Sequence, residues 1–286
     1  MKLLWYIENL LSDKYNDGDK MMMLQEIEIM TIDAMSLAEV VRYIKKSQVI
    51  ALSYPESIDI VSTWWSMMKT INTSTLCAIL LAREGHKVLK HGSNASTSNV
   101  GSFDLLSHMW ITIPQNTTEI ECEVREHNIA FLYARLFFPI FKNVTSIRKI
   151  YGKPTIFNIL WPLLSPANPQ YQMIWCAFAD KQQLMAETLA ILGRKKAYVI
   201  RGDDGLDEAT ITTSSHCFIV DNGKVSTKII HPQDYGITYA LSDEIAGGDI
   251  MYNTTIAQSI LDGTCTTRHA DLVKFNYLLA QELLSS

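Results

Sequence analysis

The sequence is poor in cysteine, has no long apolar run and carries no excess of positive charge. Its five cysteines are scattered and odd in number, without the paired spacing of a zinc site or a disulfide framework. No apolar stretch approaches the roughly 20 residues of a membrane span, and Glu8 comes too early for a secretion signal. A formal net charge of −5 argues against broad electrostatic capture of nucleic acid or anionic membrane. These absences predict a cytoplasmic protein with reduced thiols.

What the chain does have is enough apolar sequence to bury a core. It has 286 residues, of which 48% are hydrophobic, so one large domain or two unequal ones can form. Helical apolar spacing over residues 3–11 and 36–44 predicts a small helical opening. A polar, glycine-containing stretch at 12–20 and the methionines 21–23, which suit core or contact surface, separate the two helices.

The pattern changes near Ile58, where short apolar runs begin to alternate with longer helical segments. This alternation predicts an α/β sheet. Residues 218–220 and 225–230 flank Asp221-Asn222-Gly223-Lys224, and an Asn-Gly centre is a strong signal for a tight antiparallel hairpin. We therefore expect a mixed sheet, in an α/β domain covering about residues 56–286.

Three segments suggest a phosphate site, beginning with Asn72, Ser74 and Thr75. They precede an apolar helix expected at residues 76–82. A helix N-terminus offers unpaired N–H groups and the positive end of the helix dipole to an anion. Ordinary helix capping is the alternative, because serine and threonine are common caps.

The second segment is Lys90-His91-Gly92, followed by a polar loop over residues 93–98. An apolar strand delivers a cation and a glycine into this loop, and a further helix is expected to begin near Gly101. Many α/β proteins build phosphate sites in this way. A solvated lysine beside a polar turn is the alternative.

The third segment is the adjacent pair Asp207 and Glu208, which follows an apolar strand at a glycine-containing turn. Mg²⁺ prefers a few carboxylates together with water and substrate oxygens, so this pair suits it. Taken alone, two acidic residues in a turn would more often be solvated.

Together with Arg148-Lys149 and residues 155–158, these segments resemble anthranilate phosphoribosyltransferase in order and spacing. The resemblance covers roughly residues 58–279. It implies a small helical domain, here residues 1–55 completed by about 136–160, beside a larger α/β domain. It also implies Mg²⁺-dependent displacement of pyrophosphate from phosphoribosyl pyrophosphate by an acceptor, through positioning and electrostatics.

The resemblance assigns roles to particular positions. The residues expected to bind the phosphoribosyl donor are Asn72, Ser74, Thr75, Lys90, Thr97 and Ser98. Those expected to hold Mg²⁺ are Ser74, Asp207 and Glu208. Those expected to line the acceptor site are His91, Gly92, Arg148, Phe138 and Trp161, with the arginine placed to meet a carboxylate. Among them Lys90, Asp207 and Glu208 are the expected catalytic residues.

Several positions depart from the family pattern. The family's glycine-rich pyrophosphate loop, in which glycine permits close approach of the backbone, is replaced by Thr63-Trp64-Trp65-Ser66-Met67-Met68. Phe138 and Trp161 stand where the family has histidine and glycine. The tryptophans at 64 and 65 fill the cleft as core, or they form a stacking wall for an aromatic ligand; Phe138 and Trp161 are plugs or ligand wall in the same way.

Three hypotheses follow. The first is a divergent transferase that moves a phosphoribosyl or ribosyl group to an aromatic or other acceptor, with a non-standard donor or acceptor. The second is a non-catalytic protein that binds a phosphorylated, nucleotide-like ligand, as a regulatory homologue. The third is a nucleic-acid binder, which the acidity and the lack of a basic cluster beyond Arg194-Lys195-Lys196 disfavour. The family resemblance also implies a homodimer formed through the helical domain.

Overall fold

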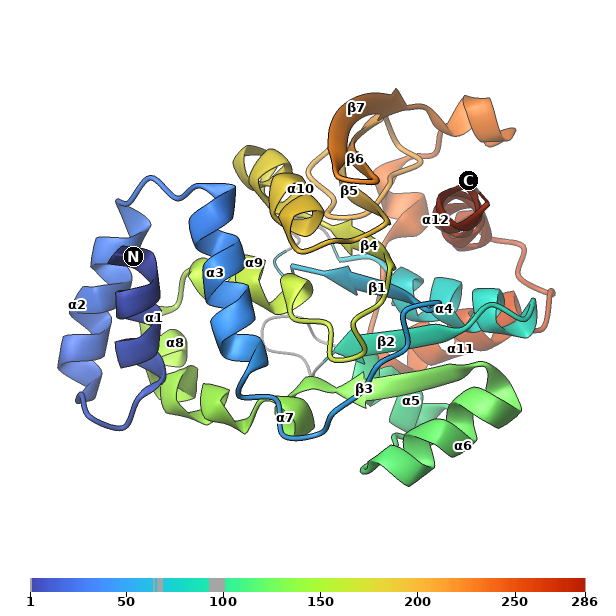
Figure 1. Ribbon diagram of the computed structural model, residues 1–286. Helices are drawn as coiled ribbons and strands as arrows, with labels where there is room; N and C mark the ends of the chain where they lie inside the picture. Colours follow the sequence, from blue (N-terminus) through green and yellow to red (C-terminus); the bar gives the residue numbers. More distant parts are fainter. Residues whose placement is uncertain (1, 64, 66–68, 93–100, 286) are drawn as a thin grey trace.

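The computed structural model describes residues 2–63, 65, 69–92 and 101–285. Trp64, Met67, Met68, Thr97 and Ser98, which carried expectations above, lie outside the described residues. The chain forms a twisted sheet covered by helices on both faces, with a group of helices beside it that contains the N-terminus (Figure 1). The C-terminal helix lies on the opposite side of this view.

The helical unit combines the start of the chain with a segment from its middle. Its elements are α1 (Lys2–Leu11), α2 (Asp17–Glu28), α3 (Ala34–Lys45), α7 (Ala134–Phe137), the 3-10 helix η1 (Pro139–Val144), α8 (Thr145–Tyr151) and α9 (Ile156–Leu163). Helix α1 contacts α2, α3 and η1, while α2 contacts α8 and α9. The two segments therefore pack as one unit.

The expectation of a polar connector before the methionines was wrong, because residues 17–28 form helix α2. The Asn16 side chain caps this helix by accepting from the Asp19 backbone N–H at 3.0 Å. The negative charges of two aspartates in the first turn interact favourably with the positive end of the helix dipole and stabilise the helix. Met23, Leu24 and Ile27 then form its buried stripe. The capping signal outweighs the helix-weakening Gly18.

The sheet has seven strands in the order β3-β2-β1-β4-β5-β6-β7. Their bounds are β1 (Ile58–Ser62), β2 (Val88–Gly92), β3 (Ile129–Tyr133), β4 (Tyr171–Trp175), β5 (Lys196–Gly202), β6 (Ser215–Asp221) and β7 (Lys224–Ile230). The first five strands in spatial order are parallel to one another. Strand β6 pairs antiparallel with β5, and β7 pairs antiparallel with β6. The expected mixed sheet and the Asn222-Gly223 hairpin are confirmed, with positive φ at both turn residues.

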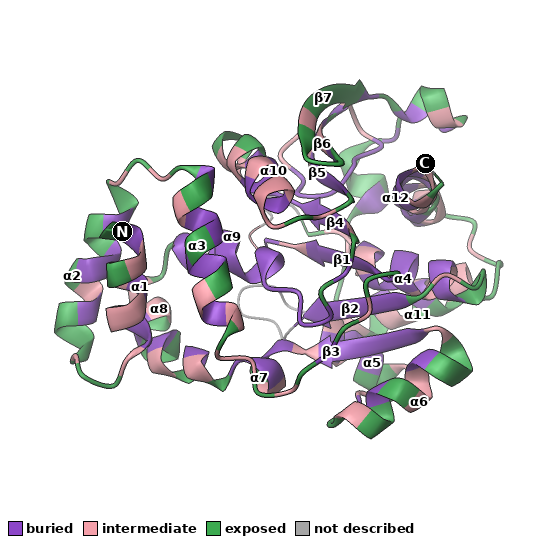
Figure 2. Ribbon diagram, in the orientation of Figure 1, coloured by how far each residue is buried: buried purple, intermediate pink, exposed green. Residues whose placement is uncertain are grey.

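Two buried clusters cover the two faces of the sheet. Helices α4 (Thr73–Arg83), α5 (Ser102–His108), α11 (Ile250–Leu261) and α12 (Arg268–Leu284) belong to one cluster. Helices α6 (Thr117–His127) and α10 (Gln182–Ile191) share the other with the helical unit. Short 3-10 helices complete the fold: η2 (Ala179–Lys181), η3 (Pro232–Tyr235) and η4 (Ser242–Ile245). Strands β1 to β5 are almost wholly buried, whereas β7 at the edge of the sheet is largely exposed (Figure 2).

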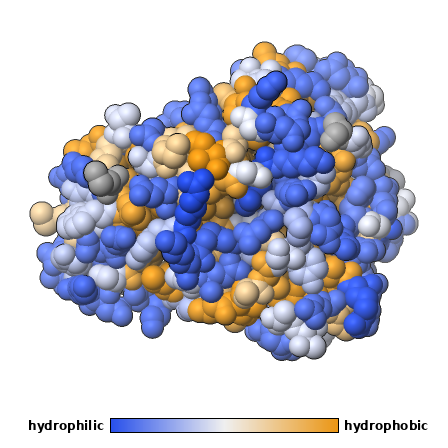
Figure 3. Space-filling model, viewed as in Figure 1, coloured by the Kyte–Doolittle hydropathy of each residue, from blue (hydrophilic) through white to orange (hydrophobic). Residues whose placement is uncertain are grey.

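The topology indicates where a ligand would bind. Strand β1 lies between β2 and β4. The chain moves from β1 to β2 and β3 on one side, and then crosses back to β4 on the other side, so the strand order reverses at β1. Ligands of open α/β sheets bind beyond the carboxyl ends of strands at such a switch point. The surface in this view is mainly hydrophilic with scattered apolar groups (Figure 3), and none of the described helices could span a membrane.

Candidate functional site

Helix α4 begins beside the carboxyl end of β1, with Asn72 as its N-cap residue. Ser74 is partly exposed and Thr75 is buried. Among the described residues the Thr75 hydroxyl has no hydrogen-bond partner. A buried hydroxyl without a partner is costly unless a ligand or water meets it. The first turn of α4 therefore offers N–H groups and a polar side chain to an anion.

Lys90 occupies β2 and is only 4% exposed. Its ammonium donates to the Ile60 carbonyl oxygen of β1 at 2.6 Å. Burial lowers the pKa of Lys90 to about 8, although the charges of Asp59 and Cys77 act in the opposite direction. A buried cation whose charge is costly is well suited to a phosphate group, which would stabilise the ammonium form.

The two adjacent carboxylates lie in the loop between β5 and β6. Asp207 and Glu208 are 9% and 2% exposed. Asn276 of α12 holds the loop, accepting from the Ala209 N–H at 3.2 Å and donating to the Ala209 carbonyl at 2.8 Å. These hydrogen bonds hold the loop so that both carboxylates are buried rather than exposed to solvent.

Glu208 meets the segment that leads into α4. The Thr70 hydroxyl donates to its Oε1 at 2.6 Å. Burial and the neighbouring charge of Asp207 raise the pKa of Glu208 to about 8, against hydrogen bonds from Thr70 and Thr73 that lower it. Sequence reasoning missed both threonines, and their only signal was their place just before and within the Asn72 segment.

The thiol of Cys77, on α4, is affected by the charges of both Lys90 and Glu208. Burial raises the pKa of this thiol, the charge of Glu208 raises it further, and the charge of Lys90 lowers it. Both charged groups are therefore close to the same helix. The structure brings Lys90, Glu208 and the start of α4 together at one edge of the sheet.

The residues expected at the acceptor side form an aromatic cluster. Trp161 stacks on Phe141 with ring centroids 4.1 Å apart and an interplanar angle of 30°. Phe141 also meets Phe138 and Phe157 edge to face, at 6.4 and 5.7 Å. Phe138 and Trp161 are 1% and 7% exposed. Both side chains pack in the interior, where they fill space between the helical unit and the sheet.

Arg148 lies at the end of this cluster. Its guanidinium carbon is 5.6 Å from the centre of the Phe157 ring, a favourable cation–π arrangement. Burial lowers the pKa of Arg148 to about 10. Within the described part of the chain it forms no ion pair with a carboxylate. The Arg148 guanidinium can therefore bind an anionic group, to which it would donate hydrogen bonds.

His91 is placed differently from Lys90 because neighbouring residues of a strand point to opposite faces. Its Nδ1 lies 2.5 Å from Asp59 Oδ2, and its Nε2 lies 3.0 Å from the Trp161 carbonyl oxygen. Both ring nitrogens are thus engaged inside the protein. Asp59 was missed in the sequence, although one carboxylate in the apolar run 58–61 was a signal that a buried partner must exist.

The motif at residues 155–158 ties α9 to the end of β1. Asn158 accepts from the Thr155 N–H at 3.0 Å, and its amide donates to the Thr63 carbonyl at 3.2 Å. A single side chain thereby closes the start of α9 and anchors it where β1 ends. This hydrogen bond fixes the position of α9, and of the aromatic cluster it carries, relative to the end of β1.

Gly92, the last residue of β2, stands where a side chain would be crowded. A Cβ atom there would lie 3.0 Å from the Phe103 ring, which is buried and packs against Tyr133. We expect Gly92→Ala to lower the free energy of unfolding by about 1–3 kcal/mol, the usual effect of overpacking. Urea unfolding would measure it. The double variant with Phe103→Leu should recover part of the loss, and an unchanged midpoint in the single variant would contradict the crowding.

Comparisons with known proteins agree with this geometry. Residues 54–284 match the model of the glycosyl transferase family, a/b domain. The chain is 37% identical to anthranilate phosphoribosyltransferase of Persephonella marina over 219 residues, which are 77% of this chain and 65% of that protein. It is 39% identical to the Rhodococcus jostii protein of that name over 206 residues, 72% and 57% of the two chains. The chain thus spans less than two thirds of the length of these curated relatives.

Solved structures show the same fold. Anthranilate phosphoribosyltransferase from Thermus thermophilus superimposes with a TM-score of 0.85 at 25% identity, covering 99% of this chain and 90% of that one. The Saccharomyces cerevisiae enzyme in complex with PRPP and Mg also gives 0.85, at 23% identity, covering 99% and 82%. The chain therefore belongs to the glycosyl transferase family of the a/b domain, among relatives named anthranilate phosphoribosyltransferases.

Proposed function

We propose that this protein transfers a phosphoribosyl group to an aromatic acceptor. The observation that carries the proposal is the meeting of Lys90, Glu208 and the N-terminus of α4 at the carboxyl edge of the parallel strands. Relatives named for this activity support it, as does the solved yeast complex with PRPP and Mg. In this proposal Lys90, Ser74 and Thr75 bind the donor phosphates, with Asn72, Thr97 and Ser98.

The two sets of side chains suggest a division of labour. Lys90 points to the sheet face covered by α4, while His91 points to the face covered by the helical unit. The donor would lie beyond the strand ends near α4, and the acceptor would approach from the helical unit past Arg148. Catalysis would then consist of holding two reactants in line in a site that excludes water.

Mg²⁺ fits the acidic pair. The described residues hold no group of three or more His, Cys, Asp or Glu side chains that could bind a metal alone. Asp207 and Glu208 supply two adjacent carboxylates, and Mg²⁺ commonly takes its other ligands from water and substrate phosphates. We propose Asp207, Glu208 and Ser74 as its holders, where the ion would neutralise charge on the leaving group.

The sequence departures lead to a finer proposal. With tryptophans at 64 and 65 and methionines at 67 and 68 in place of glycine, we propose that the donor's leaving group is held differently from that of the relatives, or that the donor or acceptor itself differs. A homodimer formed through the helical unit remains a prediction.

Calorimetric titration tests the donor half of this proposal. The protein would be titrated with phosphoribosyl pyrophosphate with and without Mg²⁺, and with ribose 5-phosphate and pyrophosphate separately. We expect Mg²⁺-dependent binding of the intact donor. Binding of ribose 5-phosphate alone would mean another donor, and binding of none of these ligands would contradict the transferase function.

Arg148 provides a test of the acceptor half. Because its guanidinium has no carboxylate partner among the described side chains, we expect Arg148→Met to raise the KM for anthranilate about 10- to 100-fold, the cost of a lost charged hydrogen bond. The KM for the donor should stay unchanged. Arg135→Met, on the neighbouring α7, is the matched control. An equal loss with acceptors that lack a carboxylate would make Arg148 structural instead.

A further inference from the structure

The C-terminal end of α9 is capped by side chains of the sheet. The last carbonyl groups of a helix lack their usual i+4 partners. Here the Trp161 carbonyl accepts from the Leu164 backbone N–H at 3.1 Å and also lies 3.0 Å from His91 Nε2. The Pro162 carbonyl accepts from Gln172 Nε2 at 2.6 Å. His91 belongs to β2 and Gln172 to β4. Two strands therefore hold one helix end.

The hydrogen-bond partners indicate the protonation of His91. A carbonyl oxygen can only accept, so the Nε2 atom facing Trp161 must carry a proton. Asp59 accepts from the His91 backbone N–H at 3.2 Å and lies 2.5 Å from Nδ1. Burial is the largest influence on the pKa of Asp59 and raises it, but the charges of His91 and Lys90 and the hydrogen bond with His91 together hold this pKa below its usual range. The short contact between Nδ1 and Oδ2 is a hydrogen bond that joins the ring to the carboxylate.

We propose that the hydrogen-bonded pair of Asp59 and His91 caps the C-terminal end of α9 and so positions Trp161. His91 is then a positioning residue and does not contact the acceptor. A side-chain donor at the C-terminal end of a helix satisfies carbonyl groups that lack their usual helical partners. The Asp59 carboxylate holds the ring in the orientation that brings Nε2 to the Trp161 carbonyl.

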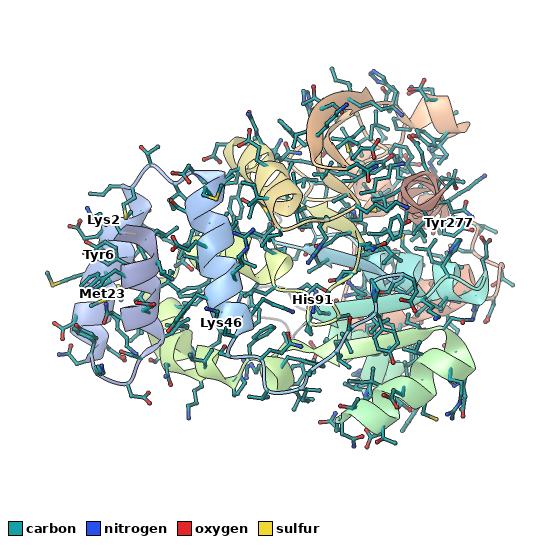
Figure 4. All side chains as sticks on the ribbon, viewed as in Figure 1. Lys2, Tyr6, Met23, Lys46, His91 and Tyr277 are labelled. Atoms are coloured by element: carbon teal, nitrogen blue, oxygen red, sulfur yellow. The ribbon has the colours of Figure 1, made fainter. Side chains whose placement is uncertain are left out.

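The pair lies where its influence reaches the acceptor side. Figure 4 shows His91 between the helical unit and the strands, and both members are buried. Three further cations act electrostatically on Asp59: Lys45 from α3, Lys90 from β2 and Arg194 from the turn before β5. From Trp161 the contact continues through Phe141 and Phe157 to Arg148. Displacement of the helix end would therefore move the acceptor wall.

Nitrogen NMR of the unmutated protein tests the cap. With histidines labelled in ¹⁵N, we expect His91 Nε2 to carry a hydrogen-bonded proton that is protected from exchange with solvent. His269 is the other buried histidine of the described chain and is identified with His269→Gln. A His91 ring whose Nε2 carries no proton would overturn the proposal.

The positioning of Trp161 is tested without any activity measurement. The protein is labelled with 5-fluorotryptophan, and the Trp161 fluorine signal is identified with Trp161→Phe. Asp59→Asn keeps the size of the side chain and removes its charge, so we expect it to shift the Trp161 signal. The signals of Trp5 and Trp110, exposed and in distant elements, are expected to stay in place and serve as the internal control. A stationary Trp161 signal would contradict the capping role.

The catalytic consequence rests on the proposed function. In Asp59→Asn we expect the dissociation constant for anthranilate to rise about 10- to 100-fold, as for a small misplacement in an active site. That for phosphoribosyl pyrophosphate should be unchanged, because Lys90 faces the other side of the sheet. Equal weakening of both ligands, or of neither, would overturn the positioning role. If the unmutated protein binds neither, the proposed function fails, and the two NMR experiments still decide whether the pair caps α9 and positions Trp161.

Discussion

Replacing Lys90 with methionine is expected to abolish most donor binding while leaving the fold intact. The buried ammonium lies on the sheet face that α4 covers, and it donates a hydrogen bond to the Ile60 carbonyl of β1. Loss of a charged hydrogen bond to phosphate should weaken phosphoribosyl pyrophosphate about 10- to 100-fold. Calorimetry at pH 7 measures the change.

A matched control exists three residues away. Lys87 is half-exposed and pairs with Glu56 at 2.7 Å on the surface. Lys87→Met removes the same charge from the same region without touching the strand ends, so it should leave donor affinity within about twofold, as expected for a screened surface charge. Equal losses in both variants would show that only net charge matters, and no loss in Lys90→Met would remove this lysine from the site.

The same lysine gives the protein a predictable dependence on pH. Its pKa is about 8 in the folded protein and ~10.4 in an unfolded chain. Between these values the folded state binds fewer protons, so the free energy of unfolding rises as pH increases from about 8 to ~10.4. Lys90→Met should therefore be more stable than the parent at pH 7, and the difference should shrink by pH 10. Donor affinity should fall as the pH rises through the pKa of Lys90, because the neutral amine attracts phosphate less.

Lys45 complicates the absolute curve but not the comparison. Burial lowers its pKa to about 7, so it contributes a rise of its own at lower pH. Because both proteins retain Lys45, the difference between parent and Lys90→Met isolates Lys90. A difference that is constant between pH 7 and pH 10 would contradict the lowered pKa.

The parts of this fold that could be predicted from sequence depend on residues that are neighbours in the chain. The Asn222-Gly223 turn needs positive φ at two residues, and asparagine and glycine are the residues that adopt it most readily. The acidic pair and the Asn72 segment were expected to share one site, because the resemblance gives them roles toward one donor and its Mg²⁺. Glu208 does accept from the Thr70 hydroxyl, just before α4. Helix α2 was missed because its cap, Asn16, stands inside a stretch that also carries a glycine.

The parts that could not be predicted depend on contacts distant in sequence. Asp59 and His91 meet across 32 residues, and His91 meets the Trp161 carbonyl across 70. Neither contact can be inferred until β1 is known to lie beside β2 and α9 to end above them. Strand alternation places Lys90 and His91 on opposite faces of β2. The resemblance had assigned them to the donor and the acceptor, respectively.

The largest effect on turnover is expected from Glu208→Gln. The amide keeps the size of the carboxyl group and can still accept from the Thr70 hydroxyl, so the loop held by Asn276 should retain its fold. One of two carboxylates proposed for Mg²⁺ is lost, however, and amides are weaker ligands for this ion. The Mg²⁺ concentration for half-maximal rate should rise at least about 100-fold, the upper end of the effect of losing an outer-shell partner.

The control for this variant must remove one negative charge from the same loop without reaching the interior. Asp203→Asn does so, since Asp203 accepts from Ser214 and lies 3.6 Å from His216 at the surface. If the carboxylates act through the ion, Glu208→Gln and Asp207→Asn should shift the Mg²⁺ dependence while Asp203→Asn leaves it in place. Melting curves without Mg²⁺ should be similar for all four proteins. A metal requirement unchanged in both site variants would exclude the acidic pair as the Mg²⁺ holder, and Lys90 would then have to bind the donor without it.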